Sequence, residues 1–470
     1  MSIEQPPLTD IKSVLEEDIK EHEVSIRGSV DTVRKQKKIS FIRVSDGSHA
    51  KGIQIIVFNK NLIPDRIGIH SSVVITGTCH ASNGKTNENE IHATSITLIG
   101  NHDRFDPATY LLAKKKQSLD MLRKEPALRI RTKTFRAIQT IRNCLTMALH
   151  EFYQNKNFQC VHTPLITGSD CEGGGDTFSV VAGSDKIGDT FFKKPAFLTV
   201  SGQLHLETYA ACGLGKGVYT FGPTFRSEHS NTSRHLSEFW MVEPEIAWCS
   251  FEELLQNAED SIAYCAASVI KKCTDELDIL WDLQHKADAD PENGDGNQLL
   301  ERIRQFSSQK PTRITYSQAV AELKDDGFEV QWGDDLSSDM EKHLTKKYKG
   351  IVTTTHYPKS LKSFYMKDVR DENYKDAQVV ECMDILVPGV GELVGGSMRE
   401  ASRERLLEKM KEKNMTIEGY EWYLDIRDHS GVQTGGYGIG FERIVQLMTG
   451  MKNIRDVIPY FRAYGSELIH

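Results

Sequence analysis

Apolar and polar residues alternate in five short segments within the first hundred positions, and turn-forming residues separate these segments. They span residues 23–30, 39–47, 52–58, 72–78 and 90–100. A period of two is the pattern of a half-buried strand. Five strands of this length are typical of an oligonucleotide-binding (OB) barrel. We therefore predict a five-stranded OB-fold barrel in residues 1–102.

Downstream, the apolar spacing changes to the period of a helix. Residues 103–130 read as a polar hinge and charged connector, and residues 131–154 fit a long amphipathic helix. Further helical stretches at 251–277 and a polar segment at 287–296 suggest an insertion of about residues 251–350 within a second domain, 131–470. A length of 470 residues allows about three compact units.

The segment 221–245, FGPTFRSEHSNTSRHLSEFWMVEPE, holds cations and an aromatic ring at fixed offsets between two extended runs. The polar turn 230–233 favours a hairpin. Arg226, Arg234, His235 and Phe239 would then reach one ligand, with guanidinium groups on phosphates and a ring against a base. The alternative is an exposed hairpin with surface ion pairs of little energetic value. The complete pattern favours a nucleoside triphosphate site.

A second cluster, GGYGIGFER at 435–443, precedes a predicted helix from Phe441 to Thr449. Glycines let the backbone approach a ligand closely, and a helix start carries positive potential. Arg443 in the first turn opposes the helix dipole, so a bound anion explains it. Glycine-rich turns are common, and this cluster gains weight only beside the first one.

Between these clusters, residues 383–400 alternate apolar residues with carboxylates. Asp384 and Glu392 are placed to bind Mg²⁺, which takes carboxylate and phosphate oxygens together. Arg399 follows Glu392 by seven positions, which in a straight strand puts it on the opposite face. We therefore expect Gly395 and Gly396 to bend the chain. A sheet edge with a glycine bulge and surface charges is the alternative.

These segments resemble the class II aminoacyl-tRNA synthetases, in the subgroup for aspartate, asparagine and lysine. Phe225, Arg226, Glu228, Arg234, His235 and Phe239 match the second motif of that family. The third motif is similar to 435–443, and the first, a dimer-forming strand, to 158–166 with Pro164. The resemblance implies an α+β fold, with the OB-fold barrel followed by a catalytic domain of antiparallel sheet flanked by helices.

The resemblance also implies a role for each motif residue. Arg226 would hold the α-phosphate of ATP, His235 the γ-phosphate side, and Phe239 would stack on adenine. Glu228 would lie near the adenine or the aminoacyl adenylate, and Arg443 would meet the γ-phosphate. Glu392 would bind the metal on ATP, with Arg399 on the α-carboxylate of the amino acid. Catalysis would rest on positioning and charge stabilisation by Arg226, Mg²⁺, Glu392 and Arg443.

Two segments, 169–178 and 199–210, should select the amino acid. Glu172 lies in a glycine-rich acidic loop that could close over the ammonium group. Ser201, Gln203 and His205 are neutral hydrogen-bonding groups. By the resemblance, aspartate enzymes carry a lysine at the position of Leu206, so a carboxylate substrate would lack its partner here. Glu243, where those enzymes have a shorter carboxylate, also favours L-asparagine.

The barrel provides candidates for tRNA contact. Arg34, Phe41 and Gln54 fall on or beside its second and third strands and are similar to the anticodon readers of the family. Phe41 would stack on a splayed base. A lone Phe in a strand is otherwise usually core. Ser29 stands where the family often has tryptophan, and Thr434 where a histidine is frequent near the amino acid pocket.

Composition adds little to this picture. A net charge of −8 and a pI near 6.1 do not suggest a nucleic-acid binder, although local basic runs such as 34–38 could contact phosphates or be solvated faces. Nine cysteines without a CxxC pair argue for a reducing compartment and against structural zinc. No signal peptide or apolar span is present, which favours the cytoplasm.

We therefore predict an enzyme that joins L-asparagine to tRNA(Asn) with ATP and Mg²⁺, as a homodimer. An aspartyl or non-discriminating enzyme is the alternative within the family, and Leu206 argues against it. A tRNA-independent asparagine synthetase would lack the barrel. A catalytically silent RNA-binding paralogue would be expected to lose Arg226, Glu392 or Arg443, and all three are present.

Overall fold

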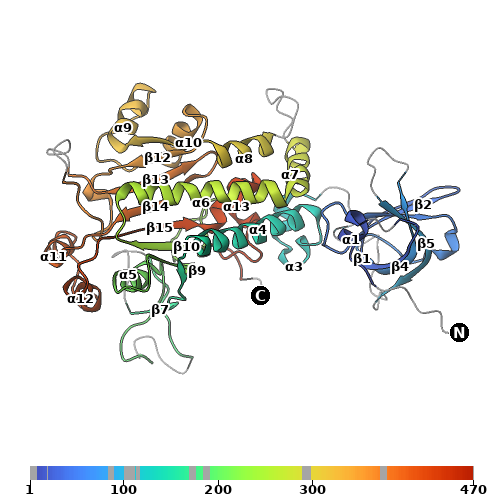
Figure 1. The fold of residues 1–470 in the computed structure, drawn as a ribbon, viewed down its shortest axis with the longest axis horizontal. Coiled ribbons are helices and arrows are strands. Elements are labelled where there is room, and N and C mark those ends of the chain that lie inside the picture. The colour runs from blue at the N-terminus through green and yellow to red at the C-terminus, as the bar shows by residue number, and fades with distance from the viewer. Residues whose placement is uncertain are drawn as a thin grey trace. The chain divides into compact units, whose positions relative to one another are not determined.

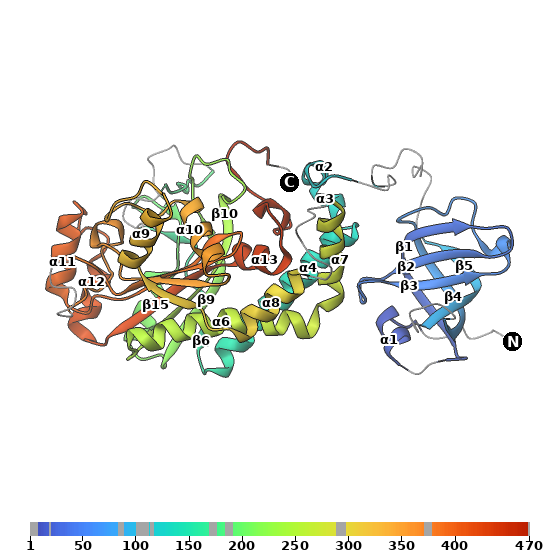
Figure 2. The same cartoon turned by 90° about the horizontal axis from the view of Figure 1, so that it is seen from above.

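A computed structural model describes residues 8–17, 20–82, 89–99, 112, 117–168, 176–183, 191–287, 298–370 and 378–468 (Figures 1 and 2). The chain divides into two compact units, Met1–Ala137 and Ile138–His470. The predicted boundaries lay near 102 and 130. The division at 137 falls inside helix α4 (Lys133–Asn155).

The first unit contains a closed five-stranded barrel, as the alternating segments predicted. Its strands are β1 (Glu23–Lys35), β2 (Ser40–Ser45), β3 (Ile53–Val57), β4 (Ser72–Ala81) and β5 (Asn89–Leu98), in the order β1-β2-β3-β5-β4. All neighbours are antiparallel except β3 and β5. Alternate side chains such as Ile26, Ile42 and Ile55 fill the interior together with Ile11 and Val14 from α1 (Ile11–Glu16). Two short helices, α2 (Leu119–Arg123) and α3 (Pro126–Arg129), precede α4.

The second unit is built on an eight-stranded sheet in the order β11-β12-β13-β14-β15-β10-β9-β6. The strands are β6 (Gln159–Cys160), β9 (Gly217–Phe225), β10 (Glu238–Ala247), β11 (Thr312–Thr315), β12 (Val352–Thr355), β13 (Cys382–Val387), β14 (Gly391–Met398) and β15 (Thr434–Gly440). Its centre is antiparallel, whereas the outer pairs β11–β12 and β6–β9 are parallel. The sheet is therefore mixed at its edges. A separate two-stranded sheet joins β7 (Ile166–Thr167) to β8 (Phe197–Leu198).

Long helices run along the sheet on one side (Figure 1). On one face lie α4 and α6 (Phe251–Lys272), whose Tyr153 and Asn257 hydrogen-bond the hydroxyl of Tyr437 on β15 at 3.0 and 2.7 Å. Helix α6 begins with a capping box formed by Ser250 and Glu253. The remaining helices are α5 (Gln203–Ala211), α7 (Thr274–Ala287), α8 (Gln298–Ser308), α9 (Tyr316–Asp325), α10 (Ser338–Lys347), α11 (Arg403–Glu412), α12 (Glu421–His429) and α13 (Phe441–Thr449).

Helix α13 has the bounds that the sequence predicted. It starts after Gly440, and it ends at Gly450, whose φ of 69° is the left-handed conformation that closes many helices. This places Arg443 in the first helical turn, directly after strand β15. The helix is thereby fixed to the central part of the sheet.

Candidate active site

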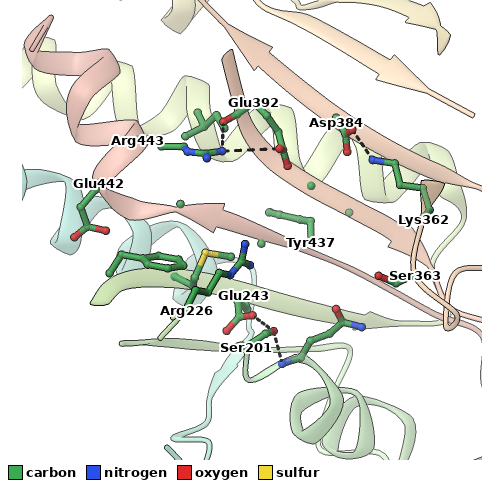
Figure 3. Close-up of a pocket in the computed structure, with 18 of the residues that line it drawn as sticks. Ser201, Arg226, Glu243, Lys362, Ser363, Asp384, Glu392, Tyr437, Glu442 and Arg443 are labelled. Atoms are coloured by element: carbon green, nitrogen blue, oxygen red, sulfur yellow. Dashed lines mark hydrogen bonds and ion pairs between the residues drawn. The ribbon is translucent and has the colours of Figure 1, made fainter. Parts of the chain in front are cut away.

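A cavity of about 330 Å³ opens on the face of the sheet opposite α6 (Figure 3). Strand β10 exposes Phe239, Met241 and Glu243 to it because alternate side chains share a face. The floor beside them has no side chains, since Gly395 of β14 pairs with Gly438 of β15. Asp384 pairs with Gly395 on the far side. The glycines thus leave room for a ligand that lies across the strands. The carboxylates of Asp384 and Glu243 line the two ends of this space.

The hairpin of β9 and β10 brings the predicted nucleotide residues together. The guanidinium carbon of Arg226 lies 5.4 Å from the centre of the Phe239 ring. The carboxylate of Glu228 lies 3.9 Å from Arg226 and 3.9 Å from Nε2 of His235. Burial lowers the pKa of His235, and the nearby arginines add to this effect, while Glu228 opposes it. The imidazole therefore stays neutral at pH 7 and can donate or accept a hydrogen bond.

Arg443 and Arg234 complete the cationic end of the cavity. Nη1 of Arg443 donates to the backbone oxygen of Glu392 at 2.7 Å, and the Glu392 carboxylate lies 3.9 Å away. Burial lowers the pKa of Arg443, which nonetheless stays charged because a guanidinium pKa is far above neutrality. Arg226, Arg234 and Arg443 line one cavity. Like charges repel there, so a polyanionic ligand is what the arrangement favours.

Asp384 and Glu392 lie where a phosphate-bound metal could meet them. A Cβ built on Gly395 would lie 3.0 Å from Oε1 of Glu392 and 3.8 Å from Oδ1 of Asp384, so both carboxylates face one small hollow. Among the described residues, no cluster of three or more His, Cys, Asp or Glu could hold a metal. Mg²⁺ commonly takes one or two carboxylates plus substrate phosphates, and this pair fits that mode.

The opposite end of the cavity is lined by Ser201, Gln203, Glu243 and Arg399. The Ser201 hydroxyl donates to Glu243, and the backbone N–H of Gly202 donates to the same carboxylate at 3.0 Å. Nε2 of Gln203 is buried and has no hydrogen-bond partner in the described part of the chain. A buried donor without a partner is costly, so a ligand oxygen is its natural acceptor.

Arg399 is almost fully buried, and part of its fork is already used. Its Nε donates to Glu245 at 3.2 Å, its Nη2 also donates to Glu245, and its Nη1 donates to Ser397 at 2.8 Å. Burial raises the pKa of Glu245, and Arg399 opposes this effect. The edge of the guanidinium group that carries Nε and Nη2 is therefore occupied by Glu245. Arg399 can reach a ligand only with the remaining N–H groups of Nη1 and Nη2.

The expected glycine bend between Glu392 and Arg399 was wrong in its location. Gly395 and Gly396 pair regularly with Asp384 and Met383. The register instead shifts one step earlier, where Ile385 pairs with Val394 but Leu386 pairs with Glu392. Leu393 is thus the extra residue of a β-bulge. This single insertion restores Glu392 and Arg399 to the same face of the sheet.

Of the described residues expected at the amino acid site, His205 and Leu206 are not found in the cavity lining. The His205 ring stacks on Trp422 at 5.1 Å, and burial lowers its pKa. Leu206 is fully buried and packs with Ala210 and Val218 in a small core cluster. Glu172 lies outside the described residues. His205 was expected beside the substrate because it shares a segment with Ser201, and Leu206 because of the family resemblance, but neither lines the cavity.

The cavity also contains residues that the sequence patterns missed. Lys362, Ser363 and Tyr365 come from the segment after the short helical turn Lys359–Leu361. Lys362 bonds to Asp384 at 2.6 Å, so the predicted metal ligand has an internal cation as partner. Burial raises the pKa of Asp384, and Lys362 opposes that shift. No period or motif marks residues 359–366, and an isolated Lys in a loop gives no signal.

In the barrel, the three predicted tRNA contacts share one outer face. Arg34 of β1 is the direct partner of Phe41 of β2, and Arg43 of β2 is the partner of Gln54 of β3. Phe41 is half-buried and lies outside the barrel core, because Ser40 and Ile42 point inward. Nε2 of Gln54 donates to Glu90 on β5 at 3.2 Å. An aromatic ring flanked by polar groups on a barrel face suits an unpaired base.

Comparisons with known proteins agree with this geometry. A family model described as tRNA synthetases class II (D, K and N) matches residues 118–463, and one for an OB-fold nucleic acid binding domain matches residues 24–99. The chain belongs to the class II tRNA synthetases. The two matches confirm the barrel and the class II catalytic fold that the sequence predicted.

Individual relatives of this class II synthetase cover nearly its whole length. An asparagine–tRNA ligase of Desulfotalea psychrophila is 42% identical, over 95% of this chain and 96% of its own. One of Protochlamydia amoebophila is 41% identical, over 94% and 95%. The crystal structure of asparaginyl-tRNA synthetase from Pyrococcus horikoshii, complexed with asparaginyl-adenylate, is 28% identical and superposes with a TM-score of 0.83, covering 98% of this chain and 99% of that one. Within the described residues, no helix is long and apolar enough to cross a membrane.

Proposed function

We propose that this class II synthetase activates L-asparagine with ATP and transfers it to the 3′ end of tRNA(Asn). The observation that carries the proposal is the cavity itself, which has three arginines at one end and an uncharged donor, Gln203, beside Glu243 at the other. ATP would lie across the glycine floor with its triphosphate toward Arg443 and its adenine on Phe239. The curated relatives named for asparagine support this choice of substrate.

Glu243 distinguishes asparagine from aspartate in this arrangement. Its carboxylate already accepts hydrogen bonds from Ser201 and Gly202, and it lines the cavity. A side-chain amide would donate to this carboxylate, whereas a second carboxylate would be repelled. A site that pairs with a substrate N–H rejects an analogue without it strongly. Aspartate should therefore bind much more weakly than asparagine.

Activation requires the amino acid carboxylate to attack the α-phosphate of ATP in line. Arg226 would hold the α-phosphate and stabilise the charge that develops on it, and Arg443 would bind the γ end of the leaving diphosphate. Asp384 and Glu392 would hold Mg²⁺, which supplies charge neutralisation on the phosphates when bound. Arg399 and Gln203 would orient the amino acid, so that positioning supplies most of the catalysis. The 3′ hydroxyl of the tRNA would then displace AMP.

The proposal extends to the partners. The outer face of the barrel with Arg34, Phe41 and Gln54 would read the anticodon, which fits the match to a nucleic acid binding domain. A homodimer in the cytoplasm is the expected working form for this family. Sedimentation of the purified chain would test the dimer directly.

The deciding experiment is ATP–pyrophosphate exchange with Mg²⁺, run separately with asparagine, aspartate and lysine. We expect exchange with asparagine alone, followed by charging of tRNA(Asn). Exchange with aspartate would show that the enzyme is an aspartyl or non-discriminating synthetase. No exchange with any of the three would refute an activating enzyme and leave RNA binding as the function.

A further inference from the structure

Arg234 of the cavity is held by a carboxylate from a helix outside the sheet. Its Nη2 lies 3.3 Å from Oε2 of Glu341, which belongs to helix α10. The Glu341 side chain is only 13% exposed, and Glu341 does not line the cavity itself. Its carboxylate therefore meets Arg234 without itself lining the cavity.

The same oxygen of Glu341 also holds strand β14. The backbone N–H of Glu392 donates to Oε2 of Glu341 at 3.2 Å. One carboxylate oxygen thus connects Arg234 of the hairpin to the strand that carries Glu392. Because the Arg234 side chain and the Glu392 N–H donate to the same oxygen, each restrains the position of the other.

The sequence leaves space for this contact at Gly391. A Cβ built on Gly391 would lie 2.3 Å from Oε2 of Glu341 and 2.6 Å from Nη2 of Arg234, so any other residue would separate them. Gly391 also has a φ of 93°, which other residues rarely adopt. The glycine at the start of β14 is therefore required both by the backbone and by the ion pair beside it.

We propose that Glu341 is a positioning residue for ATP, which acts by fixing Arg234 toward the triphosphate. The inference rests on the proposed function, in which Arg234 belongs to the ATP site. A free arginine side chain loses much rotamer freedom on binding, and a prior bond to Glu341 removes that cost before ATP arrives. Nε of Arg234 is buried without a partner among the described residues, so the arginine still has N–H groups for a phosphate.

The contact could instead compete with ATP, because a carboxylate and a phosphate are alternative partners for one guanidinium. Two features favour positioning. Glu341 contacts Arg234 through Nη2 alone, which leaves the rest of the fork open. The bond to the Glu392 N–H keeps the carboxylate in place when ATP binds. Competition would predict tighter ATP binding after removal of Glu341. The two possibilities therefore predict opposite changes in the KM for ATP.

The test measures the KM for ATP and the KM for asparagine in pyrophosphate exchange, for the full-length wild type and for Glu341→Ala. We expect the KM for ATP to rise about tenfold, the size of one lost charge-assisted hydrogen bond, with the KM for asparagine within twofold of wild type. Glu341→Gln keeps an acceptor and should raise it by about threefold. The control is Asp339→Ala, which removes a carboxylate from the same helix that is 88% exposed and should change neither KM.

A double-mutant cycle shows whether Glu341 acts through Arg234. In an Arg234→Ala background, Glu341→Ala should raise the KM for ATP much less than it does in the wild type, because only its contact with the Glu392 N–H remains to be lost. An unchanged or lower KM for ATP in Glu341→Ala, or a full additional rise in the Arg234→Ala background, would refute the proposal. If Glu341→Ala fails to fold, Glu341→Gln decides by the same criterion. Exchange by the wild type with asparagine establishes the proposed function separately, so the two failures are distinguishable.

Discussion

At the scale of single residues, Gln203 gives the sharpest test of the amino acid site. Its Nε2 is buried in the cavity without a partner in the described structure, so the folded protein alone does not benefit from it. Gln203→Leu removes this donor with little change in volume. We expect the KM for asparagine in exchange to rise at least about tenfold, while the KM for ATP stays unchanged.

Thermal unfolding of the same variant separates binding from folding. Removal of an unsatisfied buried donor should leave the melting temperature equal or slightly higher, because about 1–3 kcal/mol of desolvation cost is relieved. A lower melting temperature together with equal losses in both KM values would show that Gln203 has a structural role instead. Gln318→Leu, at a surface capping box, provides a control that should lower stability without affecting either KM.

Residues could be predicted from sequence where the chemistry lies in a local pattern. Arg226 and Phe239 are fixed by one hairpin, and that hairpin brings them to one cavity. Lys362 escaped prediction because its partner Asp384 is 22 positions away and only the fold joins them. Leu206 was assigned beside the substrate, but its position on α5 points into the core cluster with Val218. Helical phase at that position could not be fixed without knowing where α5 begins.

At the scale of elements, the glycine floor of β14 and β15 borders the proposed Mg²⁺ site. Gly395→Ala would place a Cβ 3.0 Å from Oε1 of Glu392 and 3.8 Å from Asp384, inside the hollow that both carboxylates face. We expect the Mg²⁺ concentration for half-maximal exchange to rise by roughly fivefold to tenfold, the cost of displacing one ligand by a few tenths of an ångström. A titration of exchange rate against Mg²⁺ at saturating asparagine measures it.

The matched control is Gly222→Ala, where an added Cβ meets no atom within 4 Å. Its Mg²⁺ requirement should equal that of the wild type. If Gly395→Ala also left the requirement unchanged, the two carboxylates would not hold the metal together. Addition of a chelator should abolish exchange in every variant, because the phosphates depend on Mg²⁺ for charge neutralisation.

A buried ion pair joins α4 to α13 beneath the site. Nη2 of Arg142 bonds to Oε1 of Glu442 at 2.8 Å, its Nη1 bonds to the backbone oxygen of Val457, and Glu442 accepts the Trp240 N–H at 2.9 Å. Burial raises the pKa of Glu442, and Arg142 opposes this shift. Arg142→Ala should lower the free energy of unfolding by about 3–5 kcal/mol, because it leaves a buried carboxylate unpaired.

Chemical denaturation followed by tryptophan fluorescence measures this loss. The double variant Arg142→Ala with Glu442→Gln keeps an acceptor for Trp240 but removes the buried charge, and we expect it to be more stable than Arg142→Ala alone. A double variant that is less stable than the single one would show that the charge itself is not the source of the cost. The position of a helix such as α13 can be predicted from sequence. The buried ion pair between Arg142 and Glu442 cannot, because the two partners lie 300 residues apart.

At the scale of the whole molecule, the sequence predicted the folds of the barrel and of the catalytic unit, because each depends on local patterns and family motifs. The barrel follows from strands that alternate with a period of two, and these appear in order from Glu23 to Leu98. The parallel outer strands of the catalytic sheet were not foreseen. Strand β11 pairs with β12 across a helical segment, and β6 is only two residues long, which is too short to show a period.

The barrel unit should also respond to acid. Burial and the charge of Arg131 lower the pKa of His70 from 6.5 to about 4, against an opposing effect of Asp31. The unfolded chain therefore binds more protons than the folded barrel between these values. Stability from this source is full above pH 6.5 and is lost as the pH falls toward 4. The protection factors of barrel amides, which are exchange rates corrected for the intrinsic pH dependence of amide exchange, should fall over this window, and less so in His70→Asn, which tolerates the φ of 65°.

The two units divide the reaction, and a variant of the barrel should show this. Pyrophosphate exchange needs only ATP and the amino acid, whereas charging also needs tRNA. Phe41 lies on the outer barrel face opposite Arg34 and is not part of the core. Phe41→Ala should raise the KM for tRNA(Asn) by about tenfold to a hundredfold, the value of one base stacked on a ring, and leave exchange unchanged.

The control is Glu23→Ala, at an exposed residue at the start of β1, which should change neither assay. Equal losses in exchange and charging would show that Phe41 supports the fold of the enzyme, and an unaffected KM for tRNA would move base recognition to another part of the barrel.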